Sequence, residues 1–464
     1  MPPALDRRPT STHDRTVGRA LITDLYELNM AASYLRRAMV GSATFSLFVR
    51  KLPADRGFLV AAGLEDCLSY LESFSFEDED LGWLREAGFS PDEVDAFAGL
   101  RFRGDVFAVP EGRIVLADEP ILEVTASLPE AQLVETYLLN QVTFQTALAT
   151  KATRCRLAAG DIELVDFALR RAHGVEAGMA VARLSAIAGF GSTSNVEAAR
   201  RFGLRAAGTM AHSYIEAFPK EVDAFRAFAQ DLPERTTFLV DTYDTLTGVA
   251  TAIEVIRELG LSGSLGVRLD SGDLVALARD ARSMLNEAGL PQVRIFASGG
   301  LDEYDLERFV AEAAPIDAVG VGTRMGVSAD APSLDSAYKL VAYDGRPVLK
   351  LSAGKATLPG AKQVWRRSTI EEDLLAQREE TGPDGAEPLL VPVMRAGMRV
   401  APPDGIESAR SRLSRDLAAL APEAIALREP VPPRVRVSER LGALAREITD
   451  ELADQNADDR GAAL

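Results

Sequence analysis

Short apolar stretches alternate with helical patterns from residue 160 onward, and this alternation limits the possible folds more than any other feature of the chain. Each stretch has the length of a buried strand, and a helical pattern follows it, as in residues 274–290 and 302–314. Strands that alternate with helices are typical of βα units and a parallel sheet. We therefore expect an α/β fold with an irregular (β/α) barrel of mainly parallel strands over residues 151–335. The six predicted strands are residues 162–167, 206–211, 237–241, 264–270, 293–298 and 317–322.

The two ends of the chain show a different pattern, in which short strands are joined by turns. Residues 21–150 combine helical stripes with antiparallel strands, which predicts a mixed α+β domain. The C-terminal segment 336–455 returns to a hairpin pattern with Asp344-Gly345 as its turn, so we expect it to rejoin the N-terminal domain. A chain of 464 residues is too long for one ordinary core, in line with two domains. Residues 1–20 and 456–464 are expected to be disordered tails, and the polar insertion 372–388 has no predicted role.

The formal net charge is −18, because 69 acidic residues outnumber 51 basic ones. This balance argues against nucleic acids and anionic membranes as partners, and it requires a local arginine cluster for any anionic substrate. No apolar run in the sequence reaches membrane-spanning length. Cys67 and Cys155 lack a metal-binding spacing and cannot form a disulfide framework, which favours a reducing cytoplasm. The sequence also contains no Walker, dinucleotide-binding or serine-hydrolase motif.

Polar or glycine-containing groups stand at the C-terminal end of each of the six predicted strands. In a parallel barrel all of these ends face one mouth, where such folds keep their chemistry. Among them is His212, which follows the apolar run 206–211 and is one of only three histidines in the chain. Taken alone, His212 is equally compatible with a half-buried histidine bonded to a backbone carbonyl. The convergence of all six strand ends favours a functional role for it.

Two consecutive glycine loops, at residues 296–305 and 319–326, are suited to bind phosphate. Glycines allow backbone N–H groups to converge, and the N-terminus of a following helix favours an anion. Each loop alone is also compatible with plain turn chemistry, but a consecutive pair at strand ends favours phosphate. The candidate contacts are Ser298, Gly299 and Gly300 in the first loop, and Gly322, Thr323 and Arg324 in the second.

Two other strand ends carry charge. Arg268 is a candidate clamp for pyrophosphate, and Asp270 and Asp273 are candidate ligands of Mg²⁺ or of ribose hydroxyls. The alternative for Asp273 is that it caps the helix that follows. Phe167 offers an aromatic face and Arg170 a positive charge, although a solvated arginine at a strand end would look the same.

Two segments outside these strand ends supply further candidate contacts. Tyr26 lies in the first turn of the predicted helix 23–37, where its ring faces either a site or a hydrophobic staple. Residues 189–199 offer hydroxyls, including that of Ser192, and backbone donors at a helix start, with no acid before Glu197. That environment suits an anion.

These segments together resemble the nicotinate phosphoribosyltransferase family. The resemblance implies a type II phosphoribosyltransferase, in which an irregular α/β barrel is joined to an α+β domain built from both chain ends. It also implies a homodimer with active sites at the subunit interface. The matching motifs, in family order, are TDLY at 23–26, TFSLFVRKLP at 44–53, GFLVAAGLED at 57–66, FRGDV at 102–106, DFALRRAHG at 166–174, GFGSTSN at 189–195, GTMAHSY at 208–214, VDTYDT at 240–245, RLDSGD at 268–273, SGGL at 298–301 and GVGTR at 320–324.

The resemblance also implies roles for single residues. Tyr26 of one subunit and Phe167 of the other would sandwich the pyridine ring, and Arg170 and Arg268 would bind the substrate carboxylate or phosphates. Asp270 would hold ribose or metal, and His212 would be phosphorylated by ATP. The remaining substrate contacts would be Ser192, Thr209, Ser298, Gly299, Gly300, Gly322, Thr323 and Arg324, with Asp270 and Asp273 as Mg²⁺ ligands. The implied reaction forms nicotinate mononucleotide and pyrophosphate from nicotinate and 5-phosphoribosyl 1-pyrophosphate, coupled to ATP hydrolysis, in NAD salvage.

Three alternatives remain open at this point. A nicotinamide phosphoribosyltransferase would share the barrel loops, but an amide substrate favours an acidic acceptor near the ring, and residues 189–195 contain none. A (β/α) barrel phosphosugar isomerase or lyase usually needs a lysine or an acid–base pair at the mouth, and no lysine stands at a predicted strand end. A non-catalytic binding protein that keeps the loops would bind the same substrates without turnover.

Overall fold

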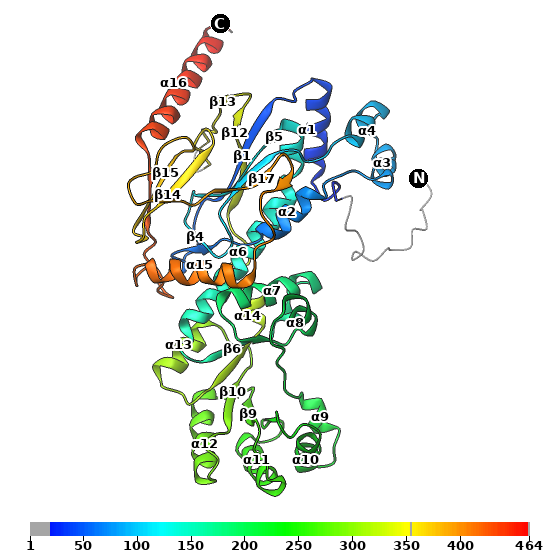
Figure 1. Cartoon of the computed structure of the whole chain (residues 1–464), viewed down its shortest axis with the longest axis vertical. Coiled ribbons are helices and arrows are strands. Elements are labelled where there is room, and N and C mark those ends of the chain that lie inside the picture. Colours follow the sequence, from blue (N-terminus) through cyan, green and yellow to red (C-terminus); the bar gives the residue numbers. More distant parts are fainter. Residues whose placement is uncertain (1–18, 353–354, 463–464) are drawn as a thin grey trace.

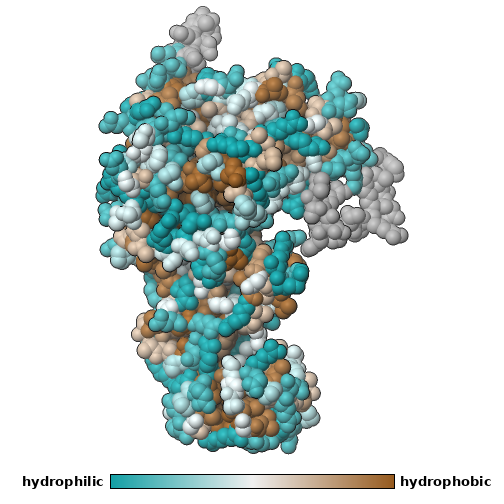
Figure 2. Space-filling view, in the orientation of Figure 1, coloured by the Kyte–Doolittle hydropathy of each residue, from teal (hydrophilic) through white to brown (hydrophobic). Residues whose placement is uncertain are grey.

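The computed structural model describes residues 19–352 and 355–462. The molecule is elongated, with a large antiparallel sheet in the upper part of Figure 1 and a parallel sheet in the lower part. Figure 2 shows hydrophilic residues over most of this face, in line with the acidic composition. No helix of the described chain is long and apolar enough to cross a membrane. Residues 1–18 and 463–464 of the predicted tails lie outside the described residues.

Strands from both ends of the chain share a seven-stranded sheet. Strand β1 (Ser42–Val49) pairs antiparallel with β5 (Pro120–Ser127) on one side and with β12 (Ser336–Tyr343) on the other. Beyond β5, β3 (Asp105–Ala108) pairs with β17 (Val391–Arg395). Strands β12 and β17, which follow residue 335, therefore pair directly with strands of the N-terminal part. The sheet ends at β13 (Arg346–Pro347) and β18 (Met398–Arg399).

The turn between β12 and β13 confirms the predicted hairpin. Asp344 and Gly345 have φ angles of +52° and +76°. Two consecutive left-handed residues match the right-handed twist of the flanking strands, and aspartate and glycine adopt this conformation at low cost.

A second sheet packs against the polar face of β1 and β5. Ser46 on β1 donates a 2.7 Å hydrogen bond to Glu123 on β5, and both side chains are fully buried. Lys362 approaches the same carboxylate at 3.3 Å. This four-stranded sheet has the order β16 (Glu387–Pro388), β14 (Lys362–Arg366), β15 (Glu372–Gln377) and β19 (Arg434–Val437). The polar insertion 372–388 therefore contains two strands of a covering sheet.

One long helix, α6 (Glu135–Ala158), runs through two hydrophobic cores. Its first half packs with the antiparallel sheet through Leu138 and Val142, and its second half packs with the parallel sheet through Ala152 and Cys155. The other elements outside the parallel sheet are α1 (Leu25–Arg36), α2 (Leu64–Glu72), α3 (Asp78–Glu86), α4 (Pro91–Ala98), α5 (Leu128–Leu133), α15 (Ile406–Ala419), α16 (Glu439–Ala462), β2 (Leu59–Val60) and β4 (Ile114–Val115).

The parallel sheet has six strands, and five of the six predicted ones are among them. All of its pairings are parallel, as the βα pattern predicts. Its order is β7 (Ser192–Thr193), β6 (Glu163–Asp166), β11 (Ala318–Val321), β10 (Arg294–Ala297), β9 (Gly266–Leu269) and β8 (Thr237–Leu239). The helices that follow these strands are α7 (Val175–Ala188), α8 (Val196–Phe202), α9 (His212–Glu216), α10 (Glu221–Asp231), α11 (Thr245–Leu259), α12 (Leu274–Glu287), α13 (Glu303–Ala311) and α14 (Thr323–Gly326).

The prediction of a strand at 206–211 is wrong, because the segment is irregular apart from one bridge. Within the described chain its one sheet contact is a single bridge between Ala206 and Thr193, and the short strand β7 takes the sixth place instead. The segment is rich in alanine and glycine, which bury little side-chain surface and favour strands weakly. Among the described residues no ladder joins β7 to β8, so the strand order is open at the side where this segment passes.

Candidate active site

The carboxyl ends of the parallel strands bring polar side chains from four segments into one cluster. Because neighbouring strands run in the same direction, their C-terminal loops meet at one edge of the sheet. Arg268 near the end of β9 contacts Ser298 after β10 and Thr209 from the irregular segment, and it lies below the ring of Phe167 after β6. The sequence prediction that these strand ends converge is confirmed for these residues.

Arg268 is the centre of the cluster and is held on several sides. Its side chain is only 9% exposed. Nε donates to Ser298 Oγ at 2.7 Å, and the two terminal nitrogens donate to Thr209 Oγ1 at 3.0 Å and to Asp270 Oδ1 at 2.6 Å. The guanidinium carbon lies 5.5 Å from the centroid of the Phe167 ring. A guanidinium that is fixed in this way presents its charge in one orientation.

Asp270 is ionised at neutral pH. Burial alone would raise the pKa of this carboxyl, but hydrogen bonds from Ser298 and Arg268 and the nearby charges lower the pKa below its ordinary value. Both hydrogen bonds end on Oδ1. The second oxygen, Oδ2, lies 4.0 Å from Nε2 of His212 and faces the histidine side of the cluster.

His212 is the first residue of α9, and its ring stands beside Asp270. Its Nδ1 lies 3.1 Å from Oγ1 of Thr242. The ring is therefore held by a side-chain hydroxyl, and not by a backbone carbonyl as in the alternative that the sequence left open. The side chain is 41% exposed. Thr242 was not among the predicted site residues, although it lies inside the matching motif VDTYDT at 240–245.

Asp241 supports the loop that carries Asp270, and it was not among the predicted site residues. Its Oδ2 accepts from the backbone N–H of Asp270 at 3.2 Å and from Ser271 Oγ at 2.6 Å. Its other oxygen, Oδ1, is buried and has no hydrogen-bond partner in the described part of the chain. The neighbouring Asp244 has a different task, because it caps α11 through the N–H of Thr247.

The first glycine loop packs tightly onto the Asp270 loop. Gly299 and Gly300 have φ angles of +112° and +71°, which glycine adopts freely. A Cβ at Gly299 would lie 2.1 Å from the carbonyl oxygen of Asp270. Ser298 is buried and donates to Asp270, so its hydroxyl is already engaged. The backbone of Gly299 and Gly300 thus remains as the exposed part of this loop.

The second glycine loop passes directly behind the Phe167 ring. A Cβ at Gly320 would lie 2.6 Å from a ring carbon, and one at Gly322 would lie 3.1 Å from the Phe167 carbonyl oxygen. Thr323 begins α14 and is exposed. Arg324 donates to Asp302 at 2.9 Å, which connects this loop to the start of α13.

Asp273 and Asp270 have different partners. The carboxylate of Asp273 accepts from Arg308 at 3.3 Å and is 59% exposed. Asp273 occupies the N-cap position of α12, but its side chain accepts no capping hydrogen bond. Within the described residues no group of three or more histidine, cysteine or acidic side chains is arranged to hold a metal ion.

The predicted contacts at β6 and β7 lie on two sides of Asp166. The buried carboxyl of Asp166 accepts from Thr193 Oγ1 at 2.6 Å and from the N–H of Ala168, which ties the two strand ends together. Ser192 is buried on β7, and its hydroxyl has no hydrogen-bond partner in the described chain. Arg170 lies in a short 3₁₀ turn and is exposed to solvent.

Tyr26 is separated from this cluster within one chain. Its helix, α1, lies beside the antiparallel sheet at the top of Figure 1, whereas β6, which leads into Phe167, lies in the lower part. Tyr26 is 48% exposed. Partial burial and the nearby carboxylates of Glu135 and Glu27 raise the pKa of its phenol, so the hydroxyl stays protonated.

Comparison with known proteins identifies the family. Three family models match successive parts of the chain: the nicotinate phosphoribosyltransferase (NAPRTase) N-terminal domain at residues 21–143, the nicotinate phosphoribosyltransferase (NAPRTase) family at 162–354 and the nicotinate phosphoribosyltransferase C-terminal domain at 362–445. The nicotinate phosphoribosyltransferase pncB2 of Mycobacterium tuberculosis is 47% identical over 437 residues, which cover 92% of this chain and 93% of that protein. The nicotinate phosphoribosyltransferase of Bacillus subtilis is 44% identical over 357 residues, covering 75% and 73%. The crystal structure of human nicotinic acid phosphoribosyltransferase aligns with a TM-score of 0.83 and 30% identity, covering 92% of this chain and 99% of that one. The chain therefore belongs to the nicotinate phosphoribosyltransferase family and is an enzyme of that type.

Proposed function

We propose that the cluster around Arg268 carries out the reaction of this family, the transfer of a phosphoribosyl group from 5-phosphoribosyl 1-pyrophosphate to nicotinate. The pyridine nitrogen bonds to the anomeric carbon as the bond to pyrophosphate breaks, which gives nicotinate mononucleotide and pyrophosphate. Such a reaction needs positioning and leaving-group stabilisation more than a protein nucleophile. The observation that carries the proposal is the fixed guanidinium of Arg268 below the Phe167 ring.

In this proposal Phe167 contacts one face of the pyridine ring, and Arg268 attracts the negative charge of the phosphates. Arg170 and Ser192 bind the substrate carboxylate. The hydroxyl of Ser192 is buried and has no hydrogen-bond partner among the described residues, which supports this assignment, because a hydroxyl donates readily to a carboxylate. It also favours nicotinate over nicotinamide, since no acidic side chain lies in residues 189–195 to receive an amide N–H.

The 5′-phosphate is assigned to the two glycine loops. The exposed backbone of Gly299 and Gly300 supports this, as does the start of α13 after residue 302. Thr323 begins α14 in the neighbouring loop and offers a hydroxyl. Arg324 joins the two loops through Asp302, so we assign it to holding their spacing as well as to adding positive charge.

A Mg²⁺ ion fits the oxygen donors of the cluster. Oδ2 of Asp270 accepts neither of the hydrogen bonds that end on Oδ1, and Oδ1 of Asp241 is buried and finds no partner in residues 19–352 and 355–462. Mg²⁺ is commonly held by one or two carboxylates together with substrate phosphates. When bound, the ion would neutralise charge on the pyrophosphate leaving group. Asp273, which pairs with Arg308, is then the weaker of the two predicted ligands.

His212 is the proposed acceptor of a phosphoryl group from ATP. The terminal phosphoryl group of ATP moves to Nε2, which releases ADP, and later hydrolysis returns the free imidazole and phosphate. The position of Thr242 at Nδ1 supports this choice of nitrogen, because it leaves Nε2 as the accessible atom. A phosphoryl group beside Asp270 would add negative charge and favour a rearrangement of the surrounding loops.

We further propose a homodimer in which Tyr26 of each subunit completes the site of the other. Two exposed apolar patches on distant parts of the chain support this. One, at the start of α1, contains Ile22, Leu25 and Tyr26, exposed by 47%, 58% and 48%. The other, around the mouth of the parallel sheet, contains Val175, Val196 and Tyr243, exposed by 58%, 71% and 66%. Two such patches can meet twice across a twofold axis.

The proposed function also includes a division of the chain into two domains. We infer that residues 151–335 act as an irregular barrel and that residues 21–150 and 336–455 form one α+β domain. The separate hydrophobic cores around the two large sheets support this division. Two buried free cysteines are in line with the proposed cytoplasmic location.

The proposed reaction can be tested by an activity assay on the purified protein. Purified chain with nicotinate, 5-phosphoribosyl 1-pyrophosphate, Mg²⁺ and ATP should release pyrophosphate and form nicotinate mononucleotide, and Arg268→Gln should lose this activity. Arg346→Gln, on the exposed β13, is the matched control and should keep it. Equal use of nicotinamide would contradict the substrate assignment, and full activity of Arg268→Gln would contradict the role of the cluster.

A further inference from the structure

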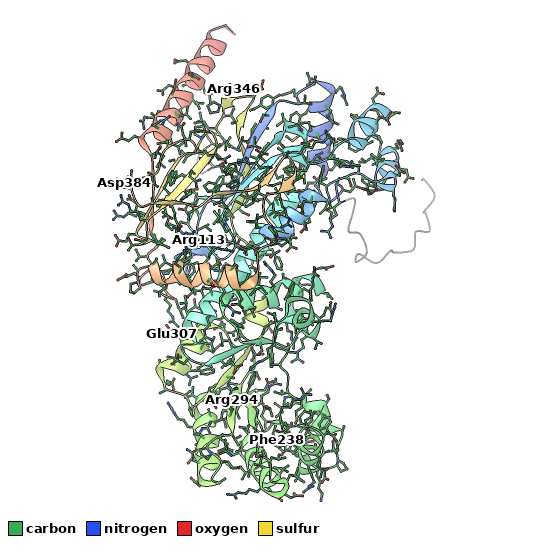
Figure 3. The ribbon with its side chains drawn as sticks, in the orientation of Figure 1. Arg113, Phe238, Arg294, Glu307, Arg346 and Asp384 are labelled. Atoms are coloured by element: carbon green, nitrogen blue, oxygen red, sulfur yellow. The ribbon has the colours of Figure 1, made fainter. Side chains whose placement is uncertain are left out.

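An arginine-rich cavity lies between the covering sheet and α15, outside the cluster described above. Its volume is about 340 Å³, and it is framed by the residue before β4, the end of β14, the start of β16 and the last turns of α15. Figure 3 places Arg113, one of its lining residues, beside α15 in the upper half of the molecule, well above the lower part that holds β10. The charged and polar residues that line it are Arg113, Arg366, Arg367, Ser368, Glu387, Arg415 and Asp416.

Two of the four guanidinium groups are buried and fixed in place. The side chains of Arg113 and Arg366 are 6% and 1% exposed. Arg113 pairs with Asp416 at 2.8 Å and with Glu387 at 2.7 Å. Arg366 pairs with Asp373 and donates to the carbonyl of Ile114 at 2.7 Å. These pairs hold the wall of the cavity in one geometry.

The other two arginines keep donors free. Arg367 is exposed, and no ion pair or hydrogen bond of its side chain is found among the described residues. Arg415 is 58% exposed, and its two carboxylate neighbours, Glu387 and Asp416, lie 3.7 Å away, beyond good hydrogen-bond distance. Ser368, which follows Arg367 in the sequence, also lines the cavity. The rim therefore offers two cations and a hydroxyl to an incoming group.

The charge around the cavity is positive despite the acidic composition of the chain. Four guanidinium groups line the cavity, against the two carboxylates of Glu387 and Asp416. Glu387 is 50% exposed and stands at the rim, where an anion can replace it.

We propose that this cavity is a binding site for a small dianion of the phosphate monoester class, and that the bound anion acts as an effector of the enzyme. Phosphate oxygens accept charge-assisted hydrogen bonds from the planar guanidinium groups of Arg367 and Arg415 and a neutral one from Ser368. The buried pair Arg113 and Arg366 provides positive potential behind the ligand. The cavity volume leaves room for an organic substituent on the phosphate.

The effector role follows from the position of α15. This helix carries Arg415 and also Arg410, whose Nε donates to the carbonyl of Ala186 on α7 at 2.9 Å. The helix α7 begins directly after the segment 166–174 that contains Phe167 and Arg170. An anion that draws Arg415 inward thus acts on the helix that follows the proposed nicotinate contacts. This effector half rests on the proposed function, whereas the binding half does not.

Equilibrium dialysis with radiolabelled inorganic phosphate at constant ionic strength tests the site. The full chain is compared with Arg367→Ala/Arg415→Ala and with the charge-matched control Arg346→Ala/Arg440→Ala. All four side chains are exposed, and Figure 3 shows Arg346 far from Arg113. Phosphate bound at the catalytic loops is common to the three proteins and cancels in the comparison. We expect the full chain and the control to bind one phosphate per chain more than the cavity variant, and equal binding by all three overturns the site.

The proposed effector role is tested by measuring the rate of pyrophosphate release with and without added phosphate. We expect phosphate to change the KM for nicotinate of the full chain and the control by roughly fivefold or more, and to change that of the cavity variant much less. The same KM response in all three proteins overturns the effector role even where the dialysis result stands. Absence of turnover in all three proteins counts against the proposed function instead, and the dialysis result still decides the site.

Discussion

The contact between Gly320 and Phe167 allows a direct test of how the parallel sheet positions the nicotinate ring. Gly320 lies in β11, directly behind the phenyl ring. In Gly320→Ala the new methyl group would lie 2.6, 2.7 and 3.2 Å from three ring carbons. An ordinary contact between carbon atoms needs about 3.5–4.0 Å, so the ring has to move outward by roughly 1 Å.

Two effects of this movement can be estimated. Overpacking of a buried site costs about 1–3 kcal/mol in the free energy of unfolding. A ring that moves away from its stacking position loses part of an interaction worth about 0.5–1.5 kcal/mol, so the KM for nicotinate should rise about 2- to 10-fold. The KM for 5-phosphoribosyl 1-pyrophosphate should change much less, because the backbone φ of residue 320 is compatible with alanine and the glycine loops keep their shape.

The assay is initial-rate pyrophosphate release at varied nicotinate, together with urea denaturation. Gly82→Ala is the control, since a Cβ at this helical position meets no atom within 4 Å. In a Phe167→Leu background the smaller side chain leaves room for the methyl group, and the KM effect of Gly320→Ala should shrink. A Gly320→Ala enzyme with unchanged KM and unchanged stability, or one with the same KM effect in both backgrounds, would refute the reasoning.

Three further predictions concern single side chains. His212→Ala should abolish phosphoenzyme formation and the stimulation by ATP while the fold remains, and an unchanged ATP response, measured with labelled ATP, excludes this residue as the acceptor. Tyr26→Ala should raise the KM for nicotinate by the loss of about 1 kcal/mol of ring contact, and an unaltered KM removes Tyr26 from the site. Burial raises the pKa of Glu27 to about 7, against an ordinary value of 4.5. Because the folded chain binds this proton more tightly than the unfolded chain does, stability should fall as the pH rises from 4.5 to 7, and Glu27→Gln should flatten that part of the profile of unfolding free energy against pH.

The sequence was most informative where local rules decide the structure. The turn at Asp344-Gly345 and the strands β6, β9, β10 and β11 follow from short-range patterns, and the structure has them within a few residues of the expected positions. The convergence of Arg268 and Ser298 follows equally from topology, because parallel strands put their carboxyl ends at one edge.

For the segment 206–211, the short-range sequence pattern predicted the wrong structure. Its small apolar residues read as a buried strand, yet several of them are exposed and the backbone makes one bridge only. What fills the sixth place in the sheet is Ser192-Thr193, a pair of hydroxyl residues inside a glycine-rich motif. Thr193 stays there because it donates to the buried Asp166, a contact 27 residues away in the sequence. A short segment of sequence around Thr193 does not show this contact with Asp166.

For the same reason, the partners of several arginines and acids could not be predicted from the sequence. The sequence does not show that Arg324 donates to Asp302 or that Arg308 lies beside Asp273. Arg113 and Asp416, the pair behind the proposed effector site, are 303 residues apart. In a chain with 51 basic and 69 acidic residues, almost any arginine has several possible partners, and only the fold selects among them. Within the described residues, Arg170, Arg367 and Arg415 are three arginines that lie at a proposed site and where a negatively charged ligand would displace no ion pair at good hydrogen-bond distance.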